Sequence, residues 1–268
     1  MSVADDAAYA QPTPRLLYVH DDLTGEVARH EGAGSPAAGL ARELLALLAR
    51  DTERVRILTL GEQVDRVVAQ GGHAPFALAL GIGAAGQRVA ETLHARAGWF
   101  PRIRRVGLTR EEDGRGGYRV ISTEAGDLAA QLAGAADCAS LAVVDDTVFS
   151  GLTMRALIAA LPEAARRRAR AFCLRGVAES IATVAALCPI TAGVAAPGRR
   201  LDDVSFINAS GLVRRVAIRR AGRPPLAFFD RPGWIRAWFP GVHGDVLALC
   251  ARLNLLLEPG GGDGPLSG

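Results

Sequence analysis

The residues with the clearest capacity for chemistry lie between Leu141 and Thr153, where the sequence reads LAVVDDTVFSGLT. Two adjacent carboxylates, Asp145 and Asp146, follow an apolar run, and Ser-Gly-Leu-Thr stands immediately before a helical pattern. The start of a helix favours an anion, hydroxyl side chains add hydrogen-bond donors, and glycine permits close approach of a ligand. Acids beside such a phosphate cradle indicate a sugar phosphate whose hydroxyl groups are held by the carboxylates. The alternative is an ordinary strand–turn–helix whose acids cap the turn and the helix.

This stretch resembles the signature of the type I phosphoribosyltransferases, which bind 5-phosphoribosyl-1-pyrophosphate (PRPP). That signature is an apolar strand, two acidic residues, three variable positions and Ser/Thr-Gly-x-Thr, and every fixed position is filled here. The resemblance implies that Asp145 and Asp146 are catalytic, face the ribose hydroxyls and are the protein ligands near a Mg²⁺ ion. It also implies that PRPP is bound through its 5-phosphate by Val148, Phe149, Ser150, Gly151, Leu152 and Thr153.

A second glycine-rich stretch lies upstream, where Gly81, Gly83 and Gly86 spell G-x-G-x-x-G between a strand-like run and a helical pattern. Alone, this is the dinucleotide fingerprint, which calls for an acid about 20 residues later. Arg110 precedes Glu111 in that region and would suit the 2′-phosphate of NADP, so an NADP-dependent enzyme is one alternative. A turn needed only for helix–strand packing is another. The family resemblance implies instead that PRPP is bound through its pyrophosphate by Gly83, Ala84, Ala85 and Gly86.

The connector at residues 110–117 reads REEDGRGG, and its charge and glycine content predict a mobile loop. It resembles the flexible loop of orotate phosphoribosyltransferases, although it is shorter and lacks the lysines and the histidine of that loop. The resemblance implies a catalytic role for Arg110 and Arg115, which would neutralise the departing pyrophosphate. A solvated hairpin tip is the alternative. The chain contains no lysine, which excludes a Schiff base and a lysine general base.

Strand-like and helical segments alternate between residues 71 and 200, which predicts an α/β fold with a parallel sheet flanked by helices. The resemblance implies a type I phosphoribosyltransferase-like core with a variable hood subdomain. In and before this core we expect strands at 15–20, 55–60, 75–81, 105–109, 118–122, 141–144, 170–177 and 190–195. We expect helices at 87–97, 152–161 and 178–187, and an amphipathic helix with Leu40, Leu44, Leu47 and Leu48 on one face.

The predicted domain organisation has four parts, which are a disordered N-terminus at 1–14, a core at 15–200 with the PRPP site within 71–200, a hood at 201–257 and a disordered tail at 258–268. In the hood we expect strands at 213–218 and 226–229 and a helix at 243–256. By the resemblance, the hood covers the site and selects the acceptor.

Aromatic residues concentrate in the predicted hood, and planar acceptors are commonly held by stacking. We therefore predict that Phe149, Phe229 and Trp234 bind the acceptor. The alternative is that the rings of the hood form its own small core. Phe149 stands where purine-using members of the family often carry an aspartate, and phenylalanine cannot take a proton, so a purine acceptor is disfavoured.

Composition bounds the remaining properties. The formal net charge is only +3, so we expect no nucleic-acid partner. We find no apolar run of roughly 18 residues and no signal-peptide pattern, and we expect no membrane partner. Four widely spaced cysteines, which are Cys138, Cys173, Cys188 and Cys250, predict a reduced cytoplasmic protein. We expect a homodimer.

Together these features predict a phosphoribosyltransferase of nucleotide metabolism. It would move the 5-phosphoribosyl group of PRPP, with Mg²⁺, to a planar non-purine acceptor and release pyrophosphate. Two alternatives stay open at this point. One is a PRPP-binding regulator without catalysis, which the missing loop lysines would suit, and the other is the NADP-dependent enzyme.

Overall fold

The structure is a computed structural model that describes residues 9–124 and 126–258 of the chain. These residues form two compact units. The first unit contains residues 9–59, 112–116 and 207–258, and the second contains residues 60–111, 117–124 and 126–206. No helix of the described residues combines the length and the hydropathy needed to cross a membrane.

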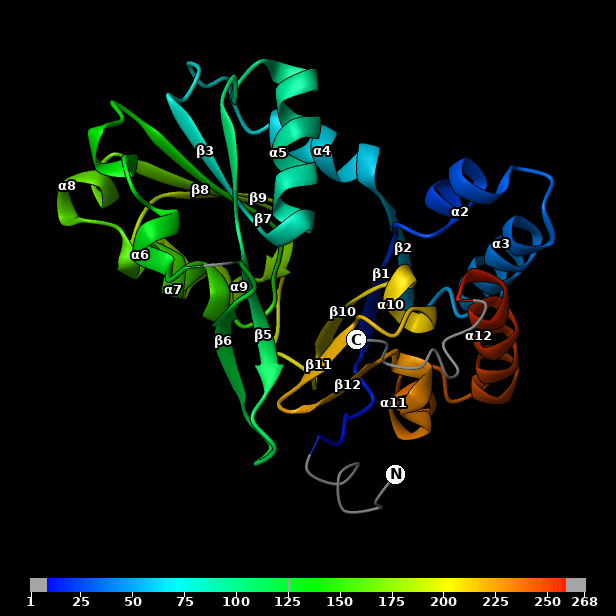
Figure 1. Ribbon diagram of the computed structural model, residues 1–268. Helices are drawn as coiled ribbons and strands as arrows, with labels where there is room; N and C mark the ends of the chain where they lie inside the picture. Colours follow the sequence, from blue (N-terminus) through cyan, green and yellow to red (C-terminus); the bar gives the residue numbers. More distant parts are fainter. Residues whose placement is uncertain (1–8, 125, 259–268) are drawn as a thin grey trace, which may run out of the picture. The chain divides into compact units, whose positions relative to one another are not determined.

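The second unit is built on a parallel sheet with the strand order β4-β3-β7-β8-β9. Every neighbouring pair in it is parallel, which confirms the predicted α/β class (Figure 1). The central strand β3 and the first four residues of β7 are entirely apolar and buried, as expected for a sheet that is covered on both faces. The strands are β3 (Leu78–Ile82), β4 (Ile103–Val106), β7 (Leu141–Val148), β8 (Ala169–Val177) and β9 (Ile190–Ala196).

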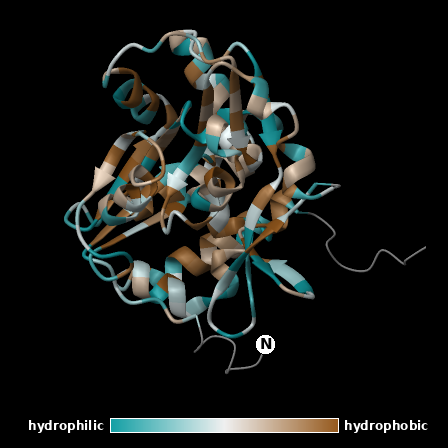
Figure 2. Ribbon diagram, turned by 90° about the vertical axis from the view of Figure 1, so that its left-hand side faces the viewer, coloured by the Kyte–Doolittle hydropathy of each residue, from teal (hydrophilic) through white to brown (hydrophobic). Residues whose placement is uncertain are grey.

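Helices cover both faces of this sheet. On one face, side chains of α4 (Leu60–Val68) and α5 (Gly83–Ala97) pack with Ala142 and Val144. On the other, α7 (Leu152–Ala160) and α9 (Ala178–Ala185) pack with Leu141 and Val143. Alternate residues of β7 therefore enter opposite clusters, as strand geometry requires. In Figure 2 the hydrophobic colour lies mainly on strands and helices, and the connecting loops are largely hydrophilic. Shorter elements complete the unit, namely α6 (Leu128–Gln131), η1 (Ala135–Asp137) and α8 (Glu163–Arg166).

Two strand predictions in this unit need correction. The strand expected at 141–144 continues to Val148, because β8 is long enough to pair with Asp145 and Thr147 as well. The strand expected at 105–109 is divided at Gly107 into β4 and β5 (Leu108–Glu112). The N–H of Gly107 donates to Oε1 of Gln131 at 2.7 Å, so this residue bonds outside the strand ladder. The next strand, β6 (Tyr118–Ser122), has the predicted bounds.

The first unit contains a smaller sheet of order β10-β1-β2, in which β1 and β2 are parallel. Its strands are β1 (Leu16–Asp21), β2 (Val55–Thr59) and β10 (Val204–Asn208), and the boundary between the units falls within β10, after residue 206. A second pair of strands, β11 (Ile218–Arg220) and β12 (Arg223–Leu226), is antiparallel. The helices are α2 (Thr24–Glu31), α3 (Pro36–Leu48), α10 (Ala209–Val213), η2 (Phe228–Asp230), α11 (Pro232–Trp238) and α12 (His243–Leu257).

The first unit does not follow the predicted division of the chain at residue 200. Residues 15–59 share a unit with residues 207–258, because α3 and α12 bury their apolar faces in one hydrophobic cluster. The strands expected at 213–218 and 226–229 are wrong in their bounds, since α10 ends at Val213 and Phe228 begins a 3₁₀ turn. The helix expected at 243–256 is present as α12.

The predicted disorder at 1–14 is also wrong where the structure describes it. Tyr9 is buried, and its carbonyl oxygen accepts a hydrogen bond from Nε1 of Trp234 at 2.7 Å. Its hydroxyl accepts a second bond from the N–H of Gly114 at 3.0 Å. These contacts anchor the segment. Residues 1–8 and 259–268, where disorder was also predicted, lie outside the described residues.

Candidate functional site

The parallel sheet of the second unit has a topological switch point between β3 and β7. Numbered by their appearance in the chain, its strands run 2-1-3-4-5 across the sheet, so successive connections leave β3 and β7 in opposite directions. In open α/β sheets, ligands bind beyond the carboxyl ends of the strands at such a point. Gly81 of β3 is in register with Val144 of β7, which places both predicted motifs at this edge. The candidate site therefore lies within one unit.

Asp145 is the first acid of the site, and it sits inside β7 rather than after it. Its Oδ1 accepts a hydrogen bond from the N–H of Asp146 at 2.8 Å. Burial raises the pKa of the Asp145 carboxyl well above its ordinary value, and the neighbouring charge of Asp146 raises it further. The positive charge of Arg110 acts in the opposite direction. Without a ligand, this carboxyl therefore holds its proton more tightly than an exposed aspartate.

Asp146 has a different environment because it is paired with a buried arginine. Its Oδ2 accepts hydrogen bonds from Nη2 of Arg175 at 3.0 Å and from Oγ1 of Thr147 at 3.1 Å. Arg175 lies in β8 and is completely buried, and its Nη1 donates to Oε1 of Gln63 in α4 at 3.0 Å. The two adjacent acids are thus unequal, since Asp146 has a counter-ion in direct contact and Asp145 does not share it.

The turn after β7 leads directly into the start of α7. Gly151 adopts a left-handed conformation with φ +70°, which a side chain would strain, and it caps the start of α7. Ser150 lies beside it, and its Oγ accepts the N–H of Leu152 at 3.3 Å. The carbonyl oxygen of Phe149 is anchored by Oγ of Ser180 at 2.7 Å. The N–H groups of the first helical turn have no hydrogen-bond acceptor within the helix, so they could donate hydrogen bonds to an anion.

The residues predicted to line this cradle differ in exposure. Val148 is buried in the hydrophobic core, so only its backbone can face a ligand. Gly151 is buried as well, whereas Leu152 and Thr153 are half-buried in the first turn of α7.

The glycines of the upstream motif have separable roles. Gly83 has φ +59° and opens α5, and Ala84 and Ala85 follow it in the same first turn. A β-carbon on Gly86 would clash with the carbonyl oxygen of Val144. A β-carbon on Gly81 would lie 2.6 Å from Cα of Gln87, which is also a clash. Gly81 and Gly86 are therefore needed for the close packing of α5 on the sheet. This packing was one of the alternatives for the motif, and it directs the start of α5 to the same edge as Asp145.

The NADP alternative is not favoured by this topology. The dinucleotide-binding order is 3-2-1-4-5-6, whereas the five strands here have the order 2-1-3-4-5.

The predicted loop arginines are divided between the two units. Arg110 belongs to the second unit, where its guanidinium lies 5.6 Å from the ring centroid of Tyr118 and its charge acts on Asp145. Arg115 belongs to the first unit, and its N–H donates to Oδ1 of Asp113 at 2.8 Å. Arg110 therefore belongs to the same unit as the two acids, and Arg115 belongs to the other unit.

The expectation of a mobile connector is wrong at Glu112. This carboxylate is buried and accepts two hydrogen bonds from Arg231, at 2.8 and 2.6 Å. The guanidinium of Arg231 also lies over the rings of Tyr9 and Trp234, with centroid distances of 4.9 and 4.8 Å. A bidentate buried ion pair stacked on two rings anchors this part of the connector in the first unit.

Two of the predicted acceptor-binding aromatics also belong to the first unit. Trp234 is buried in the hydrophobic cluster of that unit, where it packs against Phe228 and Trp238. Its indole N–H donates a hydrogen bond to the carbonyl oxygen of Tyr9. These contacts favour the alternative that the rings form a core of their own.

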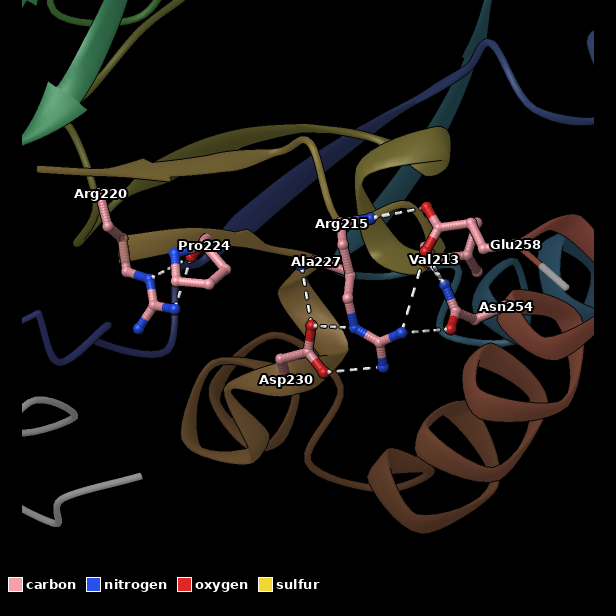
Figure 3. A network of polar contacts seen from close by, with 8 residues as sticks. All are labelled: Val213, Arg215, Arg220, Pro224, Ala227, Asp230, Asn254 and Glu258. Atoms are coloured by element: carbon pink, nitrogen blue, oxygen red, sulfur yellow. Dashed lines mark hydrogen bonds and ion pairs between the residues drawn. The ribbon is translucent and has the colours of Figure 1, made fainter. Parts of the chain in front are cut away.

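Phe229 is likewise engaged within the first unit, since the guanidinium of Arg215 lies 5.1 Å from its ring centroid. Arg215 is the centre of the polar network in Figure 3, where it donates to both carboxylate oxygens of Asp230 and to Oδ1 of Asn254. Of the three predicted aromatics, only Phe149 lies in the unit that carries the acids, and it is half-buried there.

Sequence reasoning missed Arg175 and Gln63. The signal for Arg175 was present, because it is the one charged residue between Ala171 and Val177 in an otherwise apolar predicted strand. A charge inside such a strand requires a buried partner. No comparable signal marks Gln63, which lies in a helix that was not predicted.

The donor set for a metal ion is small. Among the described residues no group of three or more His, Cys, Asp or Glu side chains could hold one. Mg²⁺ commonly binds through one or two carboxylates and keeps waters or substrate phosphate oxygens as its other ligands. Asp145 and Asp146 are two adjacent carboxylates, a number that suffices for a Mg²⁺ ion whose other ligands are waters or ligand oxygens.

Comparisons with known proteins give no assignment. No protein-family model matches the chain, and no curated protein matches it. Solved structures align with part of it, including the protein TT1426 from Thermus thermophilus, at 17% identity over 50% of this chain and 79% of that chain, with a TM-score of 0.31. A purine phosphoribosyltransferase from Pyrococcus horikoshii aligns at 14% identity over 62% and 86%, with a TM-score of 0.32. The AQ2163 protein from Aquifex aeolicus aligns at 10% identity over 67% and 88%, with a TM-score of 0.35. At these TM-scores the likenesses carry no weight for function.

Proposed function

We propose that the chain binds PRPP with Mg²⁺ and transfers its 5-phosphoribosyl group to a planar, non-purine acceptor. The observation that carries this proposal is the convergence of three features on the β3–β7 edge of one unit. These features are a pair of acids, a left-handed glycine turn at the start of α7, and the start of α5. A sugar that carries a phosphate at one end and a pyrophosphate at the other has the groups that these features would bind.

Each feature has a distinct task in the proposed reaction. The turn at 149–153 binds the 5-phosphate, and Asp145 and Asp146 accept hydrogen bonds from the ribose hydroxyls. The first turn of α5 donates its N–H groups to the pyrophosphate, and Arg110 adds a charge that cannot be neutralised by deprotonation. A bound Mg²⁺ ion neutralises part of the pyrophosphate charge. These groups stabilise the charge that develops as the leaving group departs.

The chemical step is a displacement at C1 of the ribose. The bond from C1 to the pyrophosphate oxygen breaks and its electron pair leaves with that oxygen. An electron pair of the acceptor forms the new bond to C1, and any proton on the attacking atom passes to solvent. The raised pKa of Asp145 is relevant to substrate binding, because ribose hydroxyl donors and a nearby cation both favour the charged carboxylate. Ligand binding is therefore expected to lower the pKa of this residue.

The acceptor is defined only by class. Phe149 is the aromatic residue of the predicted set that lies in the same unit as the acids, three residues after Asp146, and the family resemblance implies that it occupies the position where a purine proton would be accepted. This supports a planar acceptor that binds by stacking and needs no protein group to take a proton at that position.

Calorimetric titration of PRPP in the presence of Mg²⁺ tests the proposal. We expect saturable, Mg²⁺-dependent binding that is lost in Asp145→Asn and retained in Asp137→Asn, which changes an exposed acid on η1. Pyrophosphate release in the presence of a panel of planar acceptors then distinguishes a transferase from a regulator. Binding without release with any acceptor would support the regulator, and binding of NADP but not of PRPP would refute the proposal.

A further inference from the structure

The most unusual side chain of the second unit is the buried Arg175 of β8. Its residue is 0% exposed, and the neighbouring strand positions Cys173 and Leu174 are apolar and equally buried. A buried guanidinium is costly unless it is paired and hydrogen-bonded. Here the ion pair is made with Asp146, one of the two acids of the candidate site, at 3.0 Å.

The contacts of Arg175 connect three elements of the unit. Its Nη2 donates to Asp146 in β7 and its Nη1 donates to Gln63 in α4, both at 3.0 Å, while the side chain itself comes from β8. Gln63 is also fully buried. The planar guanidinium is thus held at both ends by groups that have little room to move, and a rigid donor of this kind restricts the carboxylate that accepts from it.

Asp146 is restricted on the same oxygen by a second donor. Oγ1 of Thr147 donates to Oδ2 at 3.1 Å, in addition to Nη2 of Arg175. With two donors on one carboxylate oxygen, the side-chain torsions of Asp146 are confined before any ligand arrives. A binding group that is ordered in advance loses less conformational entropy when the ligand binds.

We propose that Arg175 is a positioning residue for ribose recognition, which acts by orienting the carboxylate of Asp146. This inference rests on the proposed function, because it assumes that Asp146 accepts hydrogen bonds from the ribose hydroxyls. Arg175 itself is buried and does not touch the substrate. For ligands titrated without Mg²⁺ its effect is confined to the ribose part of the site, since the groups proposed to contact pyrophosphate directly lie on α5 and at Arg110.

The test compares ribose 5-phosphate with inorganic pyrophosphate as separate probes, both titrated without Mg²⁺ so that pyrophosphate does not reach Asp146 through a metal ion. In Arg175→Met we expect the dissociation constant for ribose 5-phosphate to rise about 10- to 100-fold. Losses of this size are typical when a residue that hydrogen-bonds to a metal-binding side chain, and so orients it, is replaced. Pyrophosphate affinity stays within about threefold, a change below 1 kcal/mol. Arg175→Lys keeps part of the ribose 5-phosphate affinity that Arg175→Met loses, because an ammonium group retains the charge but cannot reproduce the planar pair of donors. Arg170→Met is the matched control, since it makes the same change on the same strand, away from Asp146.

A double-substitution cycle then shows whether Arg175 acts through Asp146. If it does, Arg175→Met causes no further loss of ribose 5-phosphate affinity in the Asp146→Asn background. The double variant is also expected to melt at a higher temperature than Asp146→Asn alone, because it no longer contains a buried guanidinium without its counter-ion. Gln63→Met provides a second route if Arg175→Met does not fold, since it releases the far end of the guanidinium without changing the charge. We expect it to weaken ribose 5-phosphate and not pyrophosphate.

The outcomes separate this inference from the proposed function. If the wild-type chain binds neither PRPP nor ribose 5-phosphate, the proposed function fails, and the ribose role of Arg175 fails with it. If the wild type binds both but Arg175→Met weakens ribose 5-phosphate and pyrophosphate equally, or weakens neither, the positioning role alone is overturned. Additive losses in the double variant would also overturn it.

Discussion

The same substitution at two adjacent aspartates is predicted to change stability in opposite directions. Burial and the charge of Asp146 raise the pKa of Asp145 in the folded state above the ordinary value of 3.8. The folded chain therefore binds this proton more tightly than the unfolded chain. As the pH rises above 3.8, the folded state loses stability relative to the unfolded state, until the pH passes the folded pKa.

The magnitude follows from proton linkage. Within that window the wild type loses up to about 1.4 kcal/mol of unfolding free energy per pH unit through this one group. Asparagine carries no charge, so Asp145→Asn removes the loss. We expect the variant to be more stable than the wild type at neutral pH and to lose this advantage at a pH near 4 and below.

Asp146→Asn should have the opposite effect. It removes the counter-ion of Arg175, whose residue is fully buried, and leaves the guanidinium with a neutral amide. Removal of one partner from a buried ion pair typically costs about 3–5 kcal/mol. A double asparagine variant would therefore combine a gain and a larger loss, and it is a poor test of ligand binding.

The assay is unfolding by urea between pH 4 and pH 8, followed by native-state hydrogen exchange in β7 and β8, because two units need not unfold together. Asp137→Asn is the control for a carboxylate outside the site. The reasoning is refuted if Asp145→Asn destabilises the chain at neutral pH, or if its difference from the wild type does not vary with pH. It is also refuted if Asp146→Asn is as stable as the wild type.

Three further substitutions test other parts of the structure. Gly86→Ala should lower the free energy of unfolding by about 1–3 kcal/mol, measured by urea unfolding, because its methyl group would overlap the carbonyl oxygen of Val144. Glu112→Gln should cost about 3–5 kcal/mol in the first unit, measured by hydrogen exchange, because it leaves the buried charge of Arg231 without its partner. Trp234→Phe should lower the melting temperature because it removes the donor to the carbonyl oxygen of Tyr9, a loss that costs about 1–3 kcal/mol for a buried acceptor, and it should leave acceptor binding unchanged.

Each of these predictions has an internal comparison. Gly61→Ala adds a methyl group to α4 in open space, and it should stabilise the same unit by about 0.5–1 kcal/mol. Glu111→Gln breaks an ion pair with an exposed arginine, Arg119, and should cost less than about 1 kcal/mol. Equal effects of Gly86→Ala and Gly61→Ala, or of the two glutamine substitutions, would contradict the packing and burial arguments. Weaker acceptor binding in Trp234→Phe would instead support the prediction that Trp234 binds the acceptor.

Local patterns in the sequence were sufficient for the main elements of the second unit. The apolar runs before Asp145 and before Gly83 predicted buried parallel strands. The helical patterns after them predicted α7 to within one residue and the end of α5, although α5 begins four residues before its predicted start. These predictions succeeded because strand and helix periodicity are short-range properties. The sequence also placed both glycine motifs at the carboxyl ends of strands, and therefore at one edge of the sheet.

The roles of individual residues at that edge depended on contacts between segments that are distant in the sequence. Asp145 and Asp146 are adjacent and chemically identical, and only the burial of Arg175, together with Gln63 from α4, makes them unequal. Likewise, the charge of the 110–117 connector predicted exposure, but Arg231, 119 residues further on, makes burial of Glu112 favourable. A buried charge is stable only where the fold supplies its counter-charge. The sequence by itself therefore determined which elements form and where the acids and glycines stand along them, and the tertiary structure decided which charges are paired, which glycines serve packing, and which aromatic rings are already buried in a core.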